Sequence, residues 1–177
     1  MNSSLVMTVI GPDRPGLVES LAETVAAHEG NWVESRMANL CGQFAGILRV
    51  QVPAEKQAAL VQALRDLQGC GLSVVVQPDR PEAKAAEKTL MALEIVGHDR
   101  PGIVRQISRA LAARGVNVEE LSTECASAPM SGEILFKASA WLHVPDNCDR
   151  GQLRKELEAI AADLIVDITF EETPAAK

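Results

Sequence analysis

Hydrophobic and polar residues alternate from Leu5 to Ile10, which is the pattern of a half-buried β-strand. Between Pro15 and His28 the hydrophobic residues change to helical spacing, at Leu17, Val18, Leu21 and Val25. Gly30 ends this helix, and a second strand is predicted from Asn31 to Leu40. The chain therefore begins as strand, helix and strand.

The same half of the chain continues with a strand, a helix and a strand. Cys41 and Gly42 predict a turn into a third strand, one face of which carries Phe44, Gly46, Leu48, Val50 and Val52. A second helix after Pro53 is predicted from the spacing of Leu60, Val61, Leu64 and Leu67. Glycines at 69 and 71 end it, and the last strand carries Leu72, Val74 and Val76.

The chain then repeats itself. Gly11–Val18 recurs as Gly97–Val104, an offset of 86 residues (97 − 11), and the same offset aligns Asn31 with Asn117. Further along, Val52-Pro53 matches Val144-Pro145 at an offset of 92 residues (144 − 52). The second copy therefore contains about six extra residues, which we place in a hairpin at residues 127–132.

Each copy has the order βαββαβ. The second copy is predicted to contain a strand over Leu90–Val96, a helix over Pro101–Arg114, strands over Val116–Ala126 and Glu133–Val144, a helix with Leu153, Leu157 and Ile160, and a strand with Val166, Ile168 and Phe170. This order predicts an α+β fold of two ferredoxin-like domains, each a four-stranded antiparallel sheet with two helices on one face. We expect domains at 1–77 and 89–172, a polar, Pro-bounded linker at 78–88 and a tail at 173–177.

Composition and charge narrow the class of protein. Of the 177 residues, 47% are hydrophobic and 23% charged, as in ordinary globular proteins, and no hydrophobic run is long enough to span a membrane. Residues 1–4 lack the basic region of a signal peptide, so a cytoplasmic location is expected. The net charge is −7, and the 17 Lys and Arg residues form no cluster, so direct binding to nucleic acid is not expected.

The residues that usually bind metals or carry out catalysis form no recognisable pattern. The cysteines lie far apart and are expected to be free thiols; they are Cys41, Cys70, Cys125 and Cys148. The histidines, His28, His98 and His143, match neither a metal site nor a catalytic triad. We therefore predict no metal, no cofactor and no catalytic residue.

The repeated Asp-Arg-Pro-Gly sequence lies where the first strand of each copy leads into the first helix. Arg14 precedes Pro15 and so marks the helix boundary, and Pro15 is predicted to be the first helical residue. Gly16 allows another group to approach the backbone. The free N–H groups of Gly16, Leu17 and Val18 then point outward at the positive end of the helix dipole, where a carboxylate can bind.

Two readings of this loop are open. The motif is a good helix start by itself, but its recurrence in equivalent places favours a binding site. Asp13 either caps the helix or receives an α-ammonium group. Asn31 and Asn117, which begin the second strand of each copy and are expected beside the loop, have amides that suit a zwitterion. Trp32 and Trp141 are expected to be packing residues and not platforms for a ligand, and Glu34 and Glu120 are expected to be exposed charges on a strand.

The Asp-Arg-Pro-Gly loops, together with the two asparagines, resemble the signature of ACT domains, and the resemblance covers both halves. In that family the strand–helix loop and the neighbouring strand form amino-acid sites at interfaces between domains. The resemblance therefore implies ligand-binding residues in both copies. They are Asp13, Arg14, Pro15, Gly16, Leu17, Val18 and Asn31, and Asp99, Arg100, Pro101, Gly102, Ile103, Val104 and Asn117.

Two ACT copies with nothing else, together with residues 30–37 and 43–46, resemble the family of glycine cleavage system transcriptional repressors. This implies an amino-acid-responsive regulator, with glycine as ligand, that restrains a DNA-binding activator by protein contact. The longer hairpin, and Leu121 in place of Ser35, leave open whether one or both sites bind ligand. The alternatives are a ligand-free scaffold or oligomerisation module, or a regulatory pair serving a separate metabolic enzyme. In each case such small domains are expected to pair through their sheet edges, either between the two copies or between chains as a homo-oligomer. An enzyme is not expected, because no residues are left over for a catalytic domain.

Overall fold

The computed structural model describes residues 1–79, 90–128 and 132–172. The chain forms two compact units, unit 1 up to residue 83 and unit 2 from residue 84 onward. Most of the expected linker at 78–88 and the whole expected tail at 173–177 lie outside the described residues. Pro78 and Asp79 are described: Pro78 ends a strand, and Asp79 donates from its backbone N to the Ser4 carbonyl oxygen at 3.0 Å. These two residues therefore belong to unit 1.

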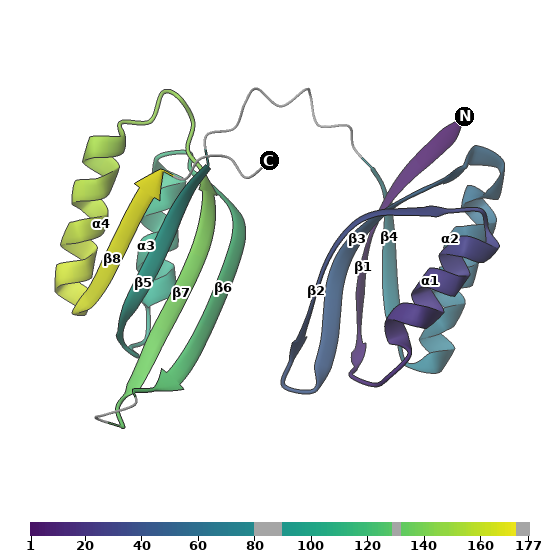
Figure 1. Cartoon of the computed structure of the whole chain (residues 1–177). Coiled ribbons are helices and arrows are strands. Elements are labelled where there is room, and N and C mark those ends of the chain that lie inside the picture. Colours follow the sequence, from purple (N-terminus) through teal and green to yellow (C-terminus); the bar gives the residue numbers. More distant parts are fainter. Residues whose placement is uncertain (80–89, 129–131, 173–177) are drawn as a thin grey trace. The chain divides into compact units, whose positions relative to one another are not determined.

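Unit 1 contains four antiparallel strands and two main helices. Its elements are β1 (Asn2–Pro12), α1 (Leu17–Ala27), β2 (Asn31–Leu40), β3 (Gln43–Pro53), the short 3-10 helix η1 (Ala54–Lys56), α2 (Gln57–Asp66), η2 (Leu67–Cys70) and β4 (Ser73–Pro78). The strand order in the sheet is β2-β3-β1-β4. Figure 1 shows both helices on one face of this sheet.

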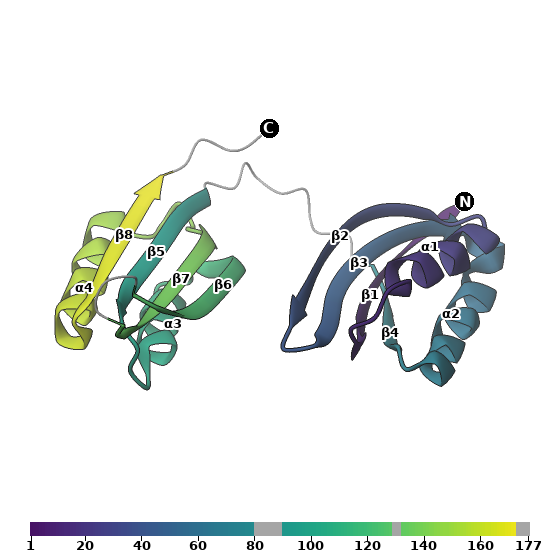
Figure 2. The same ribbon diagram turned by 60° about the horizontal axis from the view of Figure 1, so that its bottom comes forward.

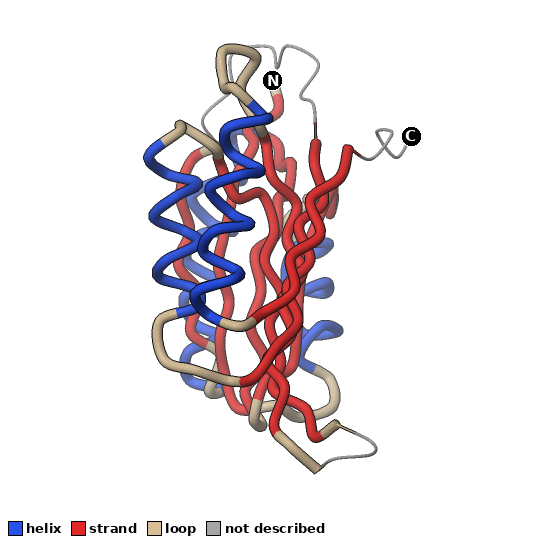
Figure 3. Tube along the Cα trace, turned by 90° about the vertical axis from the view of Figure 1, so that its left-hand side faces the viewer, coloured by secondary structure: helices blue, strands red, loops and turns tan. Residues whose placement is uncertain are grey.

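Unit 2 repeats this arrangement. Its elements are β5 (Leu90–His98), α3 (Ile103–Ala113), β6 (Asn117–Ser127), β7 (Ile134–His143), α4 (Arg150–Leu164) and β8 (Val166–Glu172). The strand order, β6-β7-β5-β8, is equivalent to that of unit 1. The tube view of Figure 3 shows the helices in blue against one face of the red strands. The predicted α+β fold with two βαββαβ domains is therefore confirmed.

The helices of each unit lie on one face of its sheet (Figure 2), and the buried hydrophobic residues form one core in each unit. In unit 1 the buried residues are Leu5, Met7, Val9, Leu17, Leu21, Val25, Leu48, Val50, Val52, Leu60, Leu64 and Leu72. The strand residues among them are those that the alternating pattern predicted, and each fully buried Leu or Val side chain contributes about 1.5–3 kcal/mol. Val18, assigned to the helical stripe by its spacing, is instead 48% exposed.

The extra residues of the second copy lie in the connection between β6 and β7. In unit 1 Leu40 pairs with Gln43 across a two-residue turn, whereas the equivalent pair in unit 2, Ala126 and Leu135, is separated by residues 127–134. The unit 1 turn is tight because both Cys41 (φ 49°) and Gly42 (φ 76°) are left-handed. The predicted position of the insertion is therefore confirmed.

The two tryptophans have different environments. Trp32 is half-buried against the unit 1 core, as expected. Trp141 is 39% exposed and does not belong to the core of unit 2. The physical reason is strand alternation: Ala140 and Leu142 of β7 point into the core, so that Trp141 points to the opposite face.

Candidate functional site

The loop between β1 and α1 begins the helix later than its sequence predicts. α1 begins at Leu17 and not at Pro15, because Gly16 is left-handed (φ 89°) and a left-handed residue does not continue a right-handed helix. Unit 2 has the same geometry: Gly102 has φ 100°, and α3 begins at Ile103. Pro15 therefore lies in a turn that precedes the helix, and the need for glycine at position 16 comes from its backbone conformation.

The first turns of α1 and α3 have no side-chain cap. The N-cap residues are Gly16 and Gly102, which have no side chain that could cap the helix. The Asp13 carboxylate makes no hydrogen bond with any of the described residues. By contrast, Asp149 caps α4 in the usual way, because its Oδ1 accepts a hydrogen bond from the Gln152 backbone N at 2.9 Å. The reading in which Asp13 caps its own helix is therefore wrong.

The space in front of these two helix starts is open. A Cβ atom built on Gly102 would meet no atom within 4 Å, and one on Gly16 would meet only Glu19 Oε2, at 3.8 Å. The first-turn amides of both helices lie at the positive end of the helix dipole. The dipole therefore favours a negatively charged group at the start of either helix.

The two loops are held from one side by the hairpin next to them. The backbone N of Asp13 donates to the Gly42 carbonyl oxygen at 2.8 Å, and that of Asp99 donates to the Ile134 carbonyl oxygen at 3.2 Å. The arginines differ, although both are exposed. Arg14 donates to the carbonyl oxygen of Cys70, whereas Arg100 has no hydrogen-bond partner among the described residues.

Asn31 does not lie beside the loop of its own unit, so the expected neighbourhood of Asn31 and this loop is wrong. Asn31 pairs with Gln51, which pairs with Ser4 near the start of β1, whereas the loop follows Pro12 at the end of β1. At about 3.3 Å per residue, this separation along the strand is roughly 25 Å. The reason is topological: α1 returns the chain to the start of β1 before β2 begins.

Asn117 of unit 2 is placed in the same way. It pairs with His143, which lies opposite Leu90 at the start of β5, and its side-chain Nδ2 donates to Glu119 Oε1 at 3.0 Å. Within either unit, the structure therefore brings together the loop residues at 13–18 or 99–104 but does not add the asparagine to them.

The charges beside the two loops differ between the units, and the sequence patterns used to predict the fold do not indicate this difference. Glu19 in the first turn of α1 corresponds at the 86-residue offset to Arg105 in the first turn of α3, and Glu23 corresponds to Arg109. A position-by-position comparison of the two copies would have found it. The surroundings of an anion at the α3 loop are therefore more positive than those at the α1 loop.

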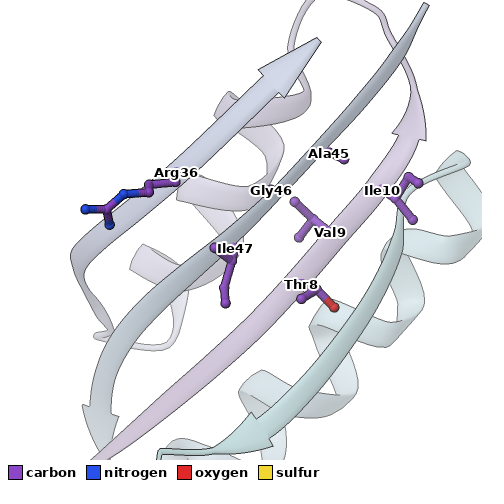
Figure 4. A pocket seen from close by; sticks show the side chains of 7 residues that line it. All are labelled: Thr8, Val9, Ile10, Arg36, Ala45, Gly46 and Ile47. Carbon is purple, nitrogen blue, oxygen red and sulfur yellow. The ribbon is translucent and has the colours of Figure 1, made fainter. Parts of the chain in front are cut away.

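The sheet faces that point away from the helices also differ between the units. In unit 1 this outer face contains a shallow, open, mostly apolar hollow, shown in Figure 4, with Arg36 at its edge. Ile10 and Ile47, which line it, are about half exposed. In unit 2 the outward positions that correspond to the lining of this hollow are mostly polar: Glu94, Ser122, Lys137 and Ser139, together with Val96.

Other kinds of site are not found in the part of the chain that the structure describes. No group of three or more His, Cys, Asp or Glu side chains there is able to hold a metal ion. The four cysteines are free, and three of them are exposed. None of the helices in the described ranges combines the length and hydropathy needed to cross a bilayer.

Comparisons with known proteins match both units. A family model described as ACT domain matches residues 3–77, and a second model with that description matches residues 91–162. A crystal structure of an unknown protein from Galdieria sulphuraria matches with a TM-score of 0.83 and 29% identity, over 98% of this chain and 100% of that one. Both the sequence models and the fold therefore agree along nearly the whole chain.

Two curated relatives match at low identity. The glycine cleavage system transcriptional repressor of Escherichia coli (strain K12) is 22% identical over 162 residues, which cover 90% of this chain and 85% of the relative. Phosphoserine phosphatase SerB2 of Mycobacterium tuberculosis is 27% identical over 177 residues, which cover 96% of this chain but 41% of the phosphatase. One relative is thus named as a regulator and the other as an enzyme of more than twice the matched length.

Proposed function

The chain belongs to the ACT domain family in both of its halves, and from this premise we propose that it is a regulator that binds a small amino acid, with glycine as the ligand. One observation carries the proposal. The helices that follow the repeated loops begin at a left-handed glycine without a side-chain cap, whereas α4 of the same chain is capped by Asp149. The first-turn N–H groups of both helices are therefore able to donate hydrogen bonds to an acceptor group of a ligand.

The chemistry of the loops suits both ends of an amino acid. The first-turn amides of α1 and α3 would donate to the carboxylate, whose charge the helix dipole favours. The carboxylates of Asp13 and Asp99, which are exposed and make no hydrogen bond with described residues, would accept the α-ammonium group. Arg100, which also has no partner among those residues, would add a positive charge near the ligand carboxylate in unit 2.

Glycine is proposed as the ligand because the Escherichia coli relative is named for the glycine cleavage system. Its small size limits the affinity. At a ceiling of about 1.5 kcal/mol per non-hydrogen atom, the five such atoms of glycine give at most about 7.5 kcal/mol, or a Kd in the micromolar range or weaker. Such a value is appropriate for sensing a free amino acid at metabolic concentration.

We further propose that the bound state is reported by protein contact with a DNA-binding transcription activator. The name of the same relative describes a transcriptional repressor. The net charge of −7 disfavours contact with phosphates, and so favours an effect on a protein over an effect on DNA. A ligand that binds one conformation or assembly better than another would shift the population that the activator meets.

A second candidate function is favoured by the match to the phosphatase. The match covers 96% of this chain but 41% of the phosphatase. A regulatory part of a larger enzyme would produce a match of this kind. In this candidate the two ACT domains sense an amino acid for a separate catalytic protein. The ligand chemistry of the loops is the same, and only the partner differs.

Isothermal titration with glycine tests the ligand. Binding heat is expected with glycine, with less or none for glycinamide, which lacks the carboxylate, and for N-acetylglycine, which lacks the ammonium group. Absence of heat with glycine, serine and alanine at millimolar concentration contradicts the proposal. Capture of partners from native lysate with and without glycine then separates the two candidates, because a transcription activator supports the first and a metabolic enzyme supports the second.

A further inference from the structure

The last strand of each unit, β4 or β8, lies at the end of its sheet, so one side of it has no neighbouring strand. The two strands are equivalent. Val76 of β4 pairs with Met7, Phe170 of β8 pairs with Leu93, and Met7 and Leu93 match at the 86-residue offset. The free edge of a sheet can bind a further strand through its backbone, and proteins usually protect it. The two edges can therefore be compared residue by residue.

The β8 edge of unit 2 is protected by a helix side chain and by charges. Arg154 of α4 donates a hydrogen bond to the carbonyl oxygen of Phe170, and its Cζ lies 5.8 Å from the centroid of the Phe170 ring. Asp167 and Glu171, on the opposite face of the same strand, are both exposed. Charged side chains on an edge strand disfavour its pairing with another strand.

The β4 edge of unit 1 has neither kind of protection. α2 and α4 each bury a pair of leucines four residues apart, and the residue after the first leucine is Val61 in α2 and Arg154 in α4. Val61 has no hydrogen-bond donor in its side chain, and no side chain among the described residues bonds to the backbone of β4. The strand itself, Ser73–Pro78, contains no charged residue.

The core of unit 1 is also less completely covered at this edge. Val74 and Val76 are only partly buried, whereas Phe170, the equivalent of Val76 in unit 2, is 2% exposed. Val75 points to the outer face of the sheet and is 55% exposed, and Val61 of α2 is partly buried. A strip of apolar side chains therefore follows a strand edge that carries no charge.

We propose that β4 of one chain pairs antiparallel with β4 of a second copy, which joins their two four-stranded sheets into one. The strand is complementary to itself about a two-fold axis at Val75. Val75 then lies opposite Val75, Val74 opposite Val76, and Ser73 opposite Gln77. Apolar residues thus meet apolar residues, polar residues meet polar residues, and no like charges are opposed.

The same arrangement is unfavourable for β8. A two-fold axis at Thr169 would place Asp167 of one copy opposite Glu171 of the other, and carboxylates in such positions repel each other. In the β4 pairing, by contrast, the α2 helices of the two copies lie on one face of the joined sheet, because α2 contacts β4 in each copy. The pairing involves neither of the strand–helix loops, so it does not depend on the proposed function.

Molar mass measured by size-exclusion chromatography with light scattering tests the pairing. The wild-type chain is expected at twice 18.9 kDa or at a higher multiple. Val75→Lys and Val75→Glu each place like charges opposite each other, so each variant is expected at half the wild-type mass. An equimolar mixture of the two variants is expected to regain the wild-type mass, because lysine then lies opposite glutamate. This recovery requires that β4 pairs with β4, since docking of β4 on another surface would leave the mixture at half the mass.

The β8 strand offers matched controls. Thr169 is equivalent to Val75 and is also exposed, so Thr169→Lys and Thr169→Glu introduce the same charges at the same place in the fold of unit 2. Both controls are expected to keep the wild-type mass. Circular dichroism is expected to show all of these variants folded, because each changed side chain is exposed.

Val61→Arg is a second test that leaves the strand unchanged. An arginine at this position can donate to the Val76 carbonyl oxygen, as Arg154 donates to that of Phe170, and is expected to halve the mass. A monomeric wild type, Val75 variants at the wild-type mass, a mixture that stays at half the mass, or a control that loses half its mass overturns the proposal. If the Val75 variants fail to fold, Val61→Arg decides, and the wild-type mass in this folded variant overturns the proposal.

Discussion

The guanidinium of Arg14 donates a hydrogen bond to the backbone carbonyl oxygen of Cys70, and this contact joins the β1–α1 loop to the turn before β4. The equivalent arginine, Arg100, makes no such bond with the described residues of unit 2. The two loops share a four-residue sequence but differ in the contacts of its arginine. Arg14 fixes its loop to the neighbouring turn, whereas Arg100 makes no hydrogen bond with the described residues.

This difference leads to a prediction for the two arginines. Arg100→Ala is expected to weaken glycine binding at unit 2 roughly five-fold, about 1 kcal/mol, because an exposed charge contact is lost. Arg14→Ala is expected to leave the affinity within two-fold and to lower the unfolding free energy of unit 1 slightly. Glycine titration and urea unfolding measure the two effects. Equal loss of affinity in both variants would contradict the assignment.

The left-handed glycines provide a second prediction. Gly16→Ala and Gly102→Ala each force a Cβ into positive φ and are expected to cost roughly 1–2 kcal/mol of unfolding free energy. They should also reduce glycine binding, because the turn that opens the helix start is disturbed. Gly69→Ala is the control: its Cβ meets open space and its φ is not in the left-handed region, so it should change neither quantity.

The aspartates separate capping from binding. Asp149→Ala is expected to lower the unfolding free energy of unit 2 by about 1 kcal/mol, because the cap of α4 is lost. Asp13→Ala and Asp99→Ala are expected to be neutral in urea unfolding but to weaken glycine binding, because neither side chain bonds to its own helix. Destabilisation by Asp13→Ala as large as that by Asp149→Ala would show that it caps after all.

Gly46 gives a prediction about packing that involves no ligand. A Cβ at this position would lie 2.4 Å from Met37 Cγ and 2.8 Å from the Arg36 carbonyl oxygen. Gly46→Ala is therefore expected to destabilise unit 1 by about 1–3 kcal/mol. The double variant with Met37→Thr, which introduces the residue found at the equivalent Thr123, should recover part of the loss. A double-mutant cycle in urea measures the coupling.

The features that the sequence predicted well depend on local pattern. Alternation at Leu5, Met7 and Val9 and the 86-residue repeat were sufficient for the strands, the helices and the two-domain fold, because burial on one face imposes both periodicities. The start of α1 was predicted two residues early, because Pro15 is compatible with a first helical turn and with the turn before it. Only the left-handed φ of Gly16 decides between them.

The features that the sequence predicted poorly depend on distant parts of the chain. Asn31 follows the loop closely in sequence, but a helix that runs the length of the sheet separates them in space. Trp141 is large and apolar, yet its odd position in β7 turns it outward. Glu19 and Arg105 occupy equivalent positions but have opposite charges. A search for repeats finds the positions that the two copies share, whereas this pair is found only by comparing the positions at which they differ.

The hairpins that support the loops have unequal lengths, and this affects how a duplicated sensor responds. The loop of unit 1 is supported by a two-residue turn between Leu40 and Gln43, whereas the equivalent pair in unit 2, Ala126 and Leu135, is six residues further apart in sequence, so the two loops have different supports and different intrinsic affinities are expected. Where both loops bind the same amino acid, they therefore saturate at different concentrations. One chain would then respond to low concentrations of the amino acid through one unit and to high concentrations through the other. It would thus cover a wider range of concentration than two identical units.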